Sequence, residues 1–79
     1  MSISVLFFGA TAEIAGKRCD EMDLAPNAIS KNVFDQILNE HPCLAAHKLH
    51  FSVNQEFATG AEVLKDGDEL AIFTAVSGG

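Results

Sequence analysis

The chain has 79 residues, a formal net charge of −6 and a hydrophobic fraction of 48%. This length and apolar content predict one small folded domain and exclude an intrinsically disordered chain. Eleven acidic residues against five basic ones argue against nucleic-acid binding, because phosphate contacts need clustered Lys and Arg. An acidic surface would instead suit a basic partner.

The sequence carries no sign of export or membrane insertion. No apolar run approaches the length of a membrane span, and the N-terminus lacks the basic region and cleavage site of a signal peptide. Cys19 and Cys43 are too few and too far apart for a disulfide framework. We therefore expect a cytoplasmic protein with two reduced, partly buried thiols.

Two strands and a short helical turn are predicted near the N-terminus. Residues 3–8 carry the β-branched and aromatic side chains typical of a strand, and residues 9–16 predict a loop with one helical turn. Residues 19–24 predict a second strand that pairs with the first as a hairpin. Met22 and Leu24 are its expected core contacts.

The main helix is predicted to begin at Ser30, whose hydroxyl can cap free N–H groups of the first turn. The apolar side chains that follow share one helical face: Val33, Phe34, Ile37 and Leu38. Pro42 disfavours helical geometry in the residue before it, so the helix should end near His41. Residues 43–46 can form one further turn.

Three strands are predicted after the helix. Residues 49–53 alternate as a half-buried strand does, and residues 54–55 turn the chain into a short strand at 56–58. The Asp- and Gly-rich residues 65–68 predict a turn before the last strand, at 69–73. One helix across a mixed sheet of four to five strands is an α+β fold, in which the first and last strands can lie parallel.

No side-chain active site is visible in the sequence. His41, Cys43, His47 and His50 match no common zinc spacing, so we predict no metal site and interpret the histidines as surface side chains. Nothing in the spacing supplies a cysteine nucleophile with a base, and there is no phosphate-binding Gly-rich loop. The remaining reactive group is the α-carboxylate of Gly79.

The chain ends on two glycines shortly after a predicted strand. Without a Cβ, glycine adopts backbone conformations closed to other residues and passes a slot too narrow for a side chain. A Gly-Gly end is therefore suited to inserting its carboxylate into another protein's active site. The alternative is a flexible end with no function.

Segments along the whole chain resemble a known family. They are Val5–Gly9, Val53–Gln55, Lys65–Ala71 and Phe73–Gly79. Together they resemble the small subunits of molybdopterin synthase, the MoaD branch of the MoaD/ThiS ubiquitin-like sulfur carriers. The chain departs from many members in having Thr74-Ala75 where they carry Pro-Pro, which leaves the tail less stiff.

The resemblance implies a ubiquitin-like β-grasp domain at residues 1–73 and a flexible tail at 74–79. It implies that an E1-like enzyme adenylates Gly79 with ATP, that the carboxylate becomes a thiocarboxylate, and that its sulfur passes to cyclic pyranopterin monophosphate in molybdenum cofactor biosynthesis. The chain would be the sulfur-donating subunit of a two-subunit sulfurtransferase and bind no cofactor itself. Its partner would be the synthase large subunit, in a heterotetramer. The residues implied to thread the partner's pocket are Val76, Ser77 and Gly78.

Strand parity predicts a docking surface on the sheet face that the helix leaves open. Leu70 and Ile72 should point inward and Ala71 outward. The apolar side chains predicted to form the partner interface are Leu6, Phe8, Phe57 and Phe73. Exposed aromatic side chains are typical interface anchors, although in a small domain some of them can instead complete the core.

Three other functions fit a Gly-Gly tail. The first is a ThiS-like carrier for thiazole synthesis, and the second is a ubiquitin-like modifier conjugated to lysines through Gly79. The third is an interaction module whose tail has no chemical role.

Overall fold

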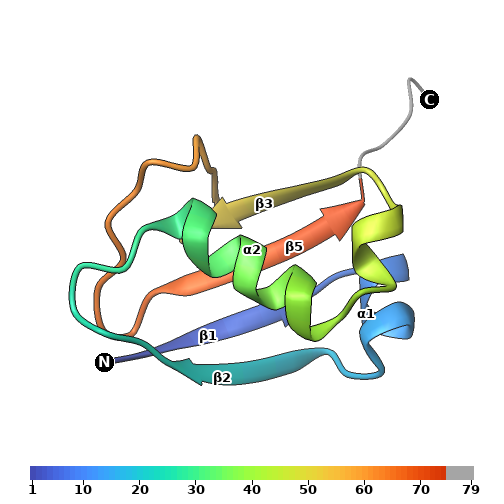
Figure 1. Cartoon of the computed structure of the whole chain (residues 1–79), viewed down its shortest axis with the longest axis horizontal. Helices are drawn as coiled ribbons and strands as arrows, with labels where there is room; N and C mark the ends of the chain where they lie inside the picture. The colour runs from blue at the N-terminus through green and yellow to red at the C-terminus, as the bar shows by residue number, and fades with distance from the viewer. Residues whose placement is uncertain (75–79) are drawn as a thin grey trace.

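The computed structural model describes residues 1–74 (Figure 1). The elements in chain order are β1 (Ser2–Phe7), α1 (Ala10–Ala15), β2 (Cys19–Asp23), α2 (Ser30–Glu40), the 3-10 helix η1 (Leu44–Ala46), β3 (Leu49–Val53), β4 (Glu56–Phe57) and β5 (Glu69–Thr74). Every predicted strand and helix is therefore confirmed. The boundary between a domain at 1–73 and a tail at 74–79 stays a prediction, because residues 75–79 lie outside the described part.

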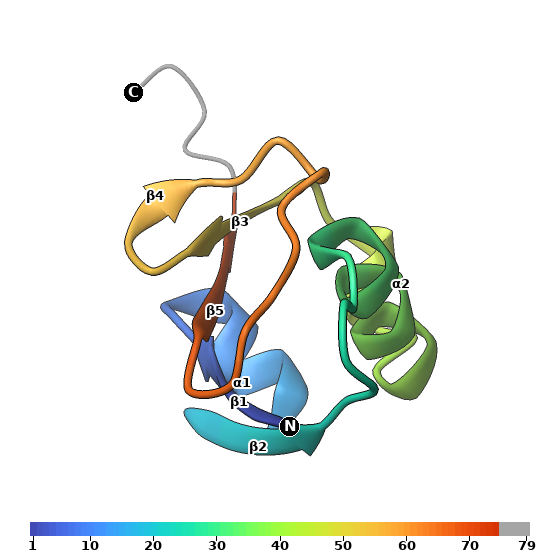
Figure 2. The ribbon, with the colours of Figure 1, turned by 90° about the vertical axis from the view of Figure 1, so that its left-hand side faces the viewer.

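The strands form one five-stranded sheet in the order β2-β1-β5-β3-β4. β1 pairs with β2 as the predicted antiparallel hairpin, and β1 and β5 lie side by side and parallel. β3 is antiparallel to both β5 and β4. Figure 2 shows α2 packed across one face of this sheet. This arrangement is the ubiquitin-like β-grasp, as the resemblance implies.

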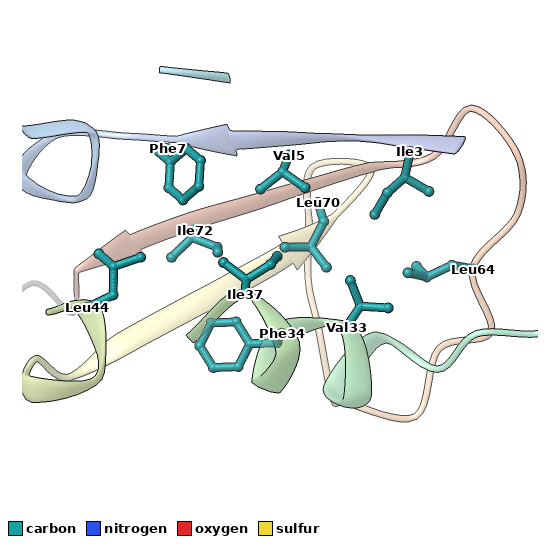
Figure 3. Close-up of a cluster of buried hydrophobic side chains, with 10 residues drawn as sticks. All are labelled: Ile3, Val5, Phe7, Val33, Phe34, Ile37, Leu44, Leu64, Leu70 and Ile72. Atoms are coloured by element: carbon teal, nitrogen blue, oxygen red, sulfur yellow. The ribbon is translucent and has the colours of Figure 1, made fainter. Parts of the chain in front are cut away.

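The core lies between the sheet and α2 (Figure 3). Its buried side chains come from alternate positions of β1 and β5, from the apolar stripe of α2, from η1, and from the loop before β5: Ile3, Val5, Phe7, Val33, Phe34, Ile37, Leu44, Leu64, Leu70 and Ile72. Met22, Leu24 and Leu38 pack against this cluster, as expected. Each fully buried aliphatic or aromatic side chain contributes about 1.5–3 kcal/mol to stability.

Ser30 does not cap α2, so this prediction was wrong. Ile29 occupies the N-cap position, and the Ser30 hydroxyl donates to Glu62 Oε1 at 2.6 Å. The first N–H groups of the helix donate to backbone oxygens of the loop before β5, Ser30 N to Glu62 O and Lys31 N to Gly60 O. The hydrogen-bond acceptors for the first N–H groups of α2 therefore come from a loop distant in sequence, and not from the Ser30 side chain.

The Glu62 carboxylate joins this loop to the start of α2. It accepts hydrogen bonds from the Ser30 hydroxyl at 2.6 Å, the Thr59 N–H at 2.7 Å, and the Thr59 hydroxyl and Gly60 N–H at 3.0 Å. These donors favour the ionised form. The Ser30 hydroxyl is the largest cause, and together they lower the pKa of Glu62 from 4.5 to about 2.

We expect Glu62→Gln to make the stability of the domain less sensitive to acid. Because the folded pKa of Glu62 is lowered, its stabilising effect is complete above its ordinary pKa of 4.5 and is lost as pH falls towards about 2. Thermal melts across this range should therefore show that the difference in thermal midpoint between wild type and Glu62→Gln becomes smaller at low pH. A difference that stays constant with pH would show that the charge of Glu62 does not stabilise the fold.

Both cysteines are free and exposed, so the expectation that they are partly buried was wrong. Cys19 stands opposite Leu6 at the first position of β2, which is an edge strand of the sheet formed by residues 1–74. Cys43 follows Pro42 in the connection between α2 and η1. No helix among residues 1–74 is long and apolar enough to cross a membrane.

Candidate functional site

The predicted interface side chains gather on the sheet face away from α2. We call Leu6, Phe8, Phe57 and Phe73 the outer apolar face. Strand register brings them together, because Leu6 lies beside Ala71, Ala71 beside Ser52, and Ser52 opposite Phe57. Phe8 is 51% exposed and Phe57 76% exposed, whereas Leu6 and Phe73 are half-buried. Their outward orientation agrees with strand parity.

Two of these phenylalanines form an aromatic cluster with a histidine. The rings of Phe57 and Phe73 meet edge to face with centroids 5.7 Å apart. The His50 ring lies 6.2 Å from that of Phe57 and 6.0 Å from that of Phe73. Such edge-to-face contacts stabilise aromatic groups beyond the area they bury. A recess of about 160 Å³ lies at this cluster, lined by Ser52, Gln55, Phe57 and Phe73.

The sequence interpretation missed His50 as part of this face. The signal was present, because the alternation of β3 puts His50 on the opposite face from Phe51. Of the other histidines, His47 is exposed, but His41 is half-buried and packs edge-on against Phe7 at 5.7 Å, so it is not a simple surface side chain. Residues 1–74 contain no group of three or more His, Cys, Asp or Glu side chains able to hold a metal ion.

Ala71 faces outward as predicted, although it is only 5% exposed. It lies in β5, the central strand of the sheet, between Leu6 of β1 and Ser52 of β3. A methyl group between larger neighbours is covered even on an open face. Leu70 and Ile72 point inward and are fully buried, as predicted.

Carboxylates also border the outer apolar face. Asp23 and Glu69 pair with Ser2 and Ser4 at the beginning of β1, and Asp66 accepts from the Ser2 N–H at 2.8 Å. In the same region a hydrogen bond from Asn54 lowers the pKa of Asp68, which keeps it charged. Phe8 and Phe73 lie towards the opposite ends of β1 and β5. Carboxylates also lie near Phe57, which shares a hollow of about 390 Å³ with Glu56 and Asp68.

A second hollow lies beside Phe8. It has a volume of about 680 Å³ and is lined by the end of β1, by α1 and by the turn into β2. Lys17 and Arg18 lie on its rim, and Lys17 is paired with Asp20 at 2.6 Å. The Lys17 hydrogen bond is the main cause that lowers the pKa of Asp20. This end of the molecule therefore places charges of both signs, Glu13, Lys17 and Arg18, next to an exposed aromatic ring.

The last described strand ends beside the outer apolar face. Thr74 pairs with Leu49, and Phe73 precedes it. The buried Thr11 of α1 places its hydroxyl against backbone oxygens of Phe8 and Ile72. Sequence analysis missed Thr11, since no periodic pattern marks a hydroxyl that bonds across to another strand. The predicted chemical residue Gly79 and the predicted threading residues Val76, Ser77 and Gly78 lie outside the described residues.

Comparison with known proteins identifies relatives along the whole chain. The model of the ThiS family matches residues 5–79. A molybdopterin synthase sulfur carrier subunit from Chlamydomonas reinhardtii is 37% identical, with 100% of both chains covered. Small archaeal modifier protein 1 from Haloferax volcanii is 34% identical, with 91% of this chain and 94% of the relative covered.

Solved structures agree with the fold described above. The crystal structure of SAMP1 from Haloferax volcanii superposes with a TM-score of 0.85 at 30% identity, and 100% of each chain is covered. The family model matches most of the chain, and the relative of 37% identity covers all of it. This chain is a member of the ThiS family.

Proposed function

We propose that the chain is the sulfur-carrier subunit of a molybdopterin synthase. Its main support is the 37% identity, over the full length of both chains, to a relative with that name. The family match also extends through Gly79, the residue with the reactive carboxylate. In this function the sulfur on Gly79 passes to cyclic pyranopterin monophosphate during molybdenum cofactor biosynthesis.

The chemistry begins at a group that is unreactive on its own. A carboxylate is a poor electrophile, and adenylation by an E1-like enzyme converts it to an acyl-phosphate anhydride with release of pyrophosphate from ATP. Hydrosulfide then attacks the carbonyl carbon, so that a carbon–sulfur bond forms while the bond to the phosphate oxygen breaks, and AMP leaves behind a thiocarboxylate. The thiocarboxylate is itself a strong nucleophile that can attack the pterin precursor. The chain needs no bound cofactor for these steps, because ATP is used by the activating enzyme.

The outer apolar face is the surface proposed to dock on the large subunit. It contains two exposed phenylalanines, Phe8 and Phe57, and the Phe57 ring contacts that of Phe73. Phe73 lies in β5, the last strand before the tail. Aromatic side chains at the centre of an interface supply much of its binding energy. Docking through this face would bring the tail to the pocket of the partner, where the two subunits together form the enzyme, in the expected heterotetramer.

A protein modifier is the second candidate function. The relative from Haloferax volcanii, at 34% identity, is named a modifier protein. A modifier would use the same adenylated Gly79 but transfer it to a lysine amine, so that the chain becomes covalently attached to other proteins. Gel analysis of cell extracts distinguishes the two, because only the modifier gives high-mass adducts that disappear when Gly79 is deleted.

Deletion of the gene is expected to abolish growth on nitrate as the nitrogen source without creating a thiamine requirement. Nitrate reductase needs the molybdopterin cofactor, whereas a ThiS-like carrier for thiazole synthesis would be needed for thiamine. Growth should return when the wild-type gene is restored. A deletion strain that grows on nitrate but requires thiamine would contradict the proposal and favour the thiazole pathway.

Gly78→Ala is expected to slow adenylation or sulfur transfer while the isolated domain stays as stable as wild type. The substitution adds one methyl group, which clashes wherever a partner's slot grips the backbone or requires a positive φ. A misplacement of the reacting group by about 1 Å can slow a reaction roughly a hundredfold. Single-turnover assays of both steps show whether the pocket of the activating enzyme or that of the large subunit is the tighter one. Normal rates in both would contradict the idea that Gly-Gly serves to pass a narrow channel.

A further inference from the structure

A buried hydroxyl connects the two backbone segments that carry Phe8 and Phe73. Thr11 lies in the first turn of α1 and is 0% exposed. Its Oγ1 lies 2.6 Å from the carbonyl oxygen of Phe8 and 3.0 Å from that of Ile72. One side chain therefore contacts the residue that follows β1 and the residue before Phe73 in β5.

Phe8 depends on such contacts because it lies beyond the last residue of β1. The next residue, Gly9, has φ 57° and ψ −129°, and the space where its Cβ would be is open to 4 Å. The turn formed by Phe8 and Gly9 after β1 is thus not fixed by packing at Gly9. It is held by hydrogen bonds, from Phe8 N to Ile72 O at 3.0 Å and from Thr11 N to Phe8 O at 3.2 Å, together with the Thr11 hydroxyl.

We propose that Thr11 is a positioning residue that sets Phe8 in register with Phe73 and with the last residues of β5. Its hydroxyl would hold the two parts of the outer apolar face at one spacing, so that the face and the tail meet the large subunit in one orientation. The consequence for docking rests on the proposed function. The effect on Phe8 itself is a property of the free chain and is tested without a partner.

The hydrogen-bond arrangement indicates that the Thr11 hydroxyl orients the turn at Phe8 and Gly9 more than it contributes to the stability of the domain. Both carbonyl oxygens keep a backbone donor when the hydroxyl is removed, Phe8 O from Thr11 N and Ile72 O from Phe8 N. No buried oxygen is left without a partner, so the domain should still fold. A methyl carbon, however, cannot approach an oxygen to the 2.6 Å of this hydrogen bond. Thr11→Val must therefore displace Phe8 or rotate away from it.

Three variants separate an effect on the position of Phe8 from an effect on the stability of the domain. Thr11→Val replaces the hydroxyl by a methyl group of similar size, and Thr11→Ser keeps the hydroxyl. Ser30→Ala is the matched control, because Ser30 is also 0% exposed and its hydroxyl also makes a 2.6 Å hydrogen bond. Ser30 begins α2, at the opposite end of the molecule from the end of β5 (Figure 1).

The first measurement is amide hydrogen exchange in the free, full-length chain. The exchange rate of the Phe8 amide, relative to that of Leu70 in the core, should rise about tenfold in Thr11→Val. It should stay near the wild-type value in Thr11→Ser and Ser30→Ala. An unchanged ratio in Thr11→Val, or an equal rise in Thr11→Ser, would overturn the proposal.

The second measurement is the dissociation constant for the synthase large subunit. Thr11→Val should weaken docking about tenfold, and Thr11→Ser should restore it. If Ser30→Ala weakened docking as much as Thr11→Val, the loss of affinity would be explained by lower stability of the domain, and the positioning role would be overturned. If the wild-type chain did not dock at all, the proposed function would fail, while the exchange data would still decide whether Thr11 positions Phe8.

Discussion

Deletion of Gly79 is expected to abolish sulfur transfer to the pterin precursor and to leave the thermal midpoint of the domain unchanged. In the proposed function the reacting atoms belong to this residue, so no neighbouring side chain can replace them. The hydrophobic core is built from residues up to Ile72, and the described sheet ends at Thr74. Single-turnover assays with the large subunit measure the first effect, and thermal melts measure the second.

Asn32→Ala is a suitable control for this deletion, because Asn32 is an exposed residue of α2, which covers the sheet face opposite the outer apolar face. It should transfer sulfur at the wild-type rate. Product formation by the Gly79 deletion at a comparable rate would show that the carrier function does not depend on this carboxylate. Replacement of Gly79 by a bulky residue should have the same effect as the deletion.

Phe8→Asp is expected to weaken the complex with the large subunit by about 2 kcal/mol or more, the range of interface hot spots. Docking would bury this position, so a carboxylate there would lose hydration, and the apolar contact made by the Phe8 ring would be lost. The stability of the free domain should change much less, because Phe8 is already 51% exposed. Calorimetric titration and thermal melts test the two halves of the expectation.

Asn32→Asp provides the matched control for Phe8→Asp. Asn32 is an exposed residue of α2, so the same charge is introduced at an exposed position, but on the side of the sheet opposite the outer apolar face. Its affinity for the large subunit should equal that of wild type. If Phe8→Asp also bound with wild-type affinity, Phe8 would not belong to the interface.

Phe73→Asp should weaken the complex at least as much, with a larger loss of stability in the free domain. Phe73 is half-buried, and its ring contacts those of Phe57 and His50 at centroid distances of 5.7 Å and 6.0 Å. A charge there disrupts the aromatic cluster before any partner binds. Titration of the folded variant separates the two losses, and unchanged affinity would remove Phe73 from the interface.

Local sequence pattern was sufficient to predict the elements and the direction of their side chains. The period-two alternation of β1 and β5 assigned Val5 and Leu70 to the core and Leu6 and Phe73 to the other face, and the structure agrees. Pro42 correctly predicted where α2 ends, since it restricts the residue before it. These features depend on covalent geometry and on burial of one face, which are local properties.

The errors arise where contacts between distant segments decide the outcome. Ser30 was predicted as a cap, but the loop around Glu62 reaches the start of α2 and takes over this role. Ala71 points outward as predicted, but strand parity does not show that its neighbours in the two adjacent strands cover it. The Thr11 hydroxyl lies against the oxygen of Ile72, a residue of the last strand. No periodicity in a single segment encodes such contacts, because they depend on the order of strands in the sheet.

Intact-mass spectrometry of the chain purified from its native host tests the central claim most directly. The claim is that the carboxylate of Gly79 carries sulfur, which requires the replacement of one carboxylate oxygen by one sulfur atom. The spectrum should contain a species heavier by the mass difference between these atoms, and fragmentation should place the increase on Gly79. A strain that lacks the activating enzyme should give only the unmodified mass. A native protein that carries only an unmodified C-terminal carboxylate, under conditions in which the cell makes molybdenum cofactor, would contradict the account.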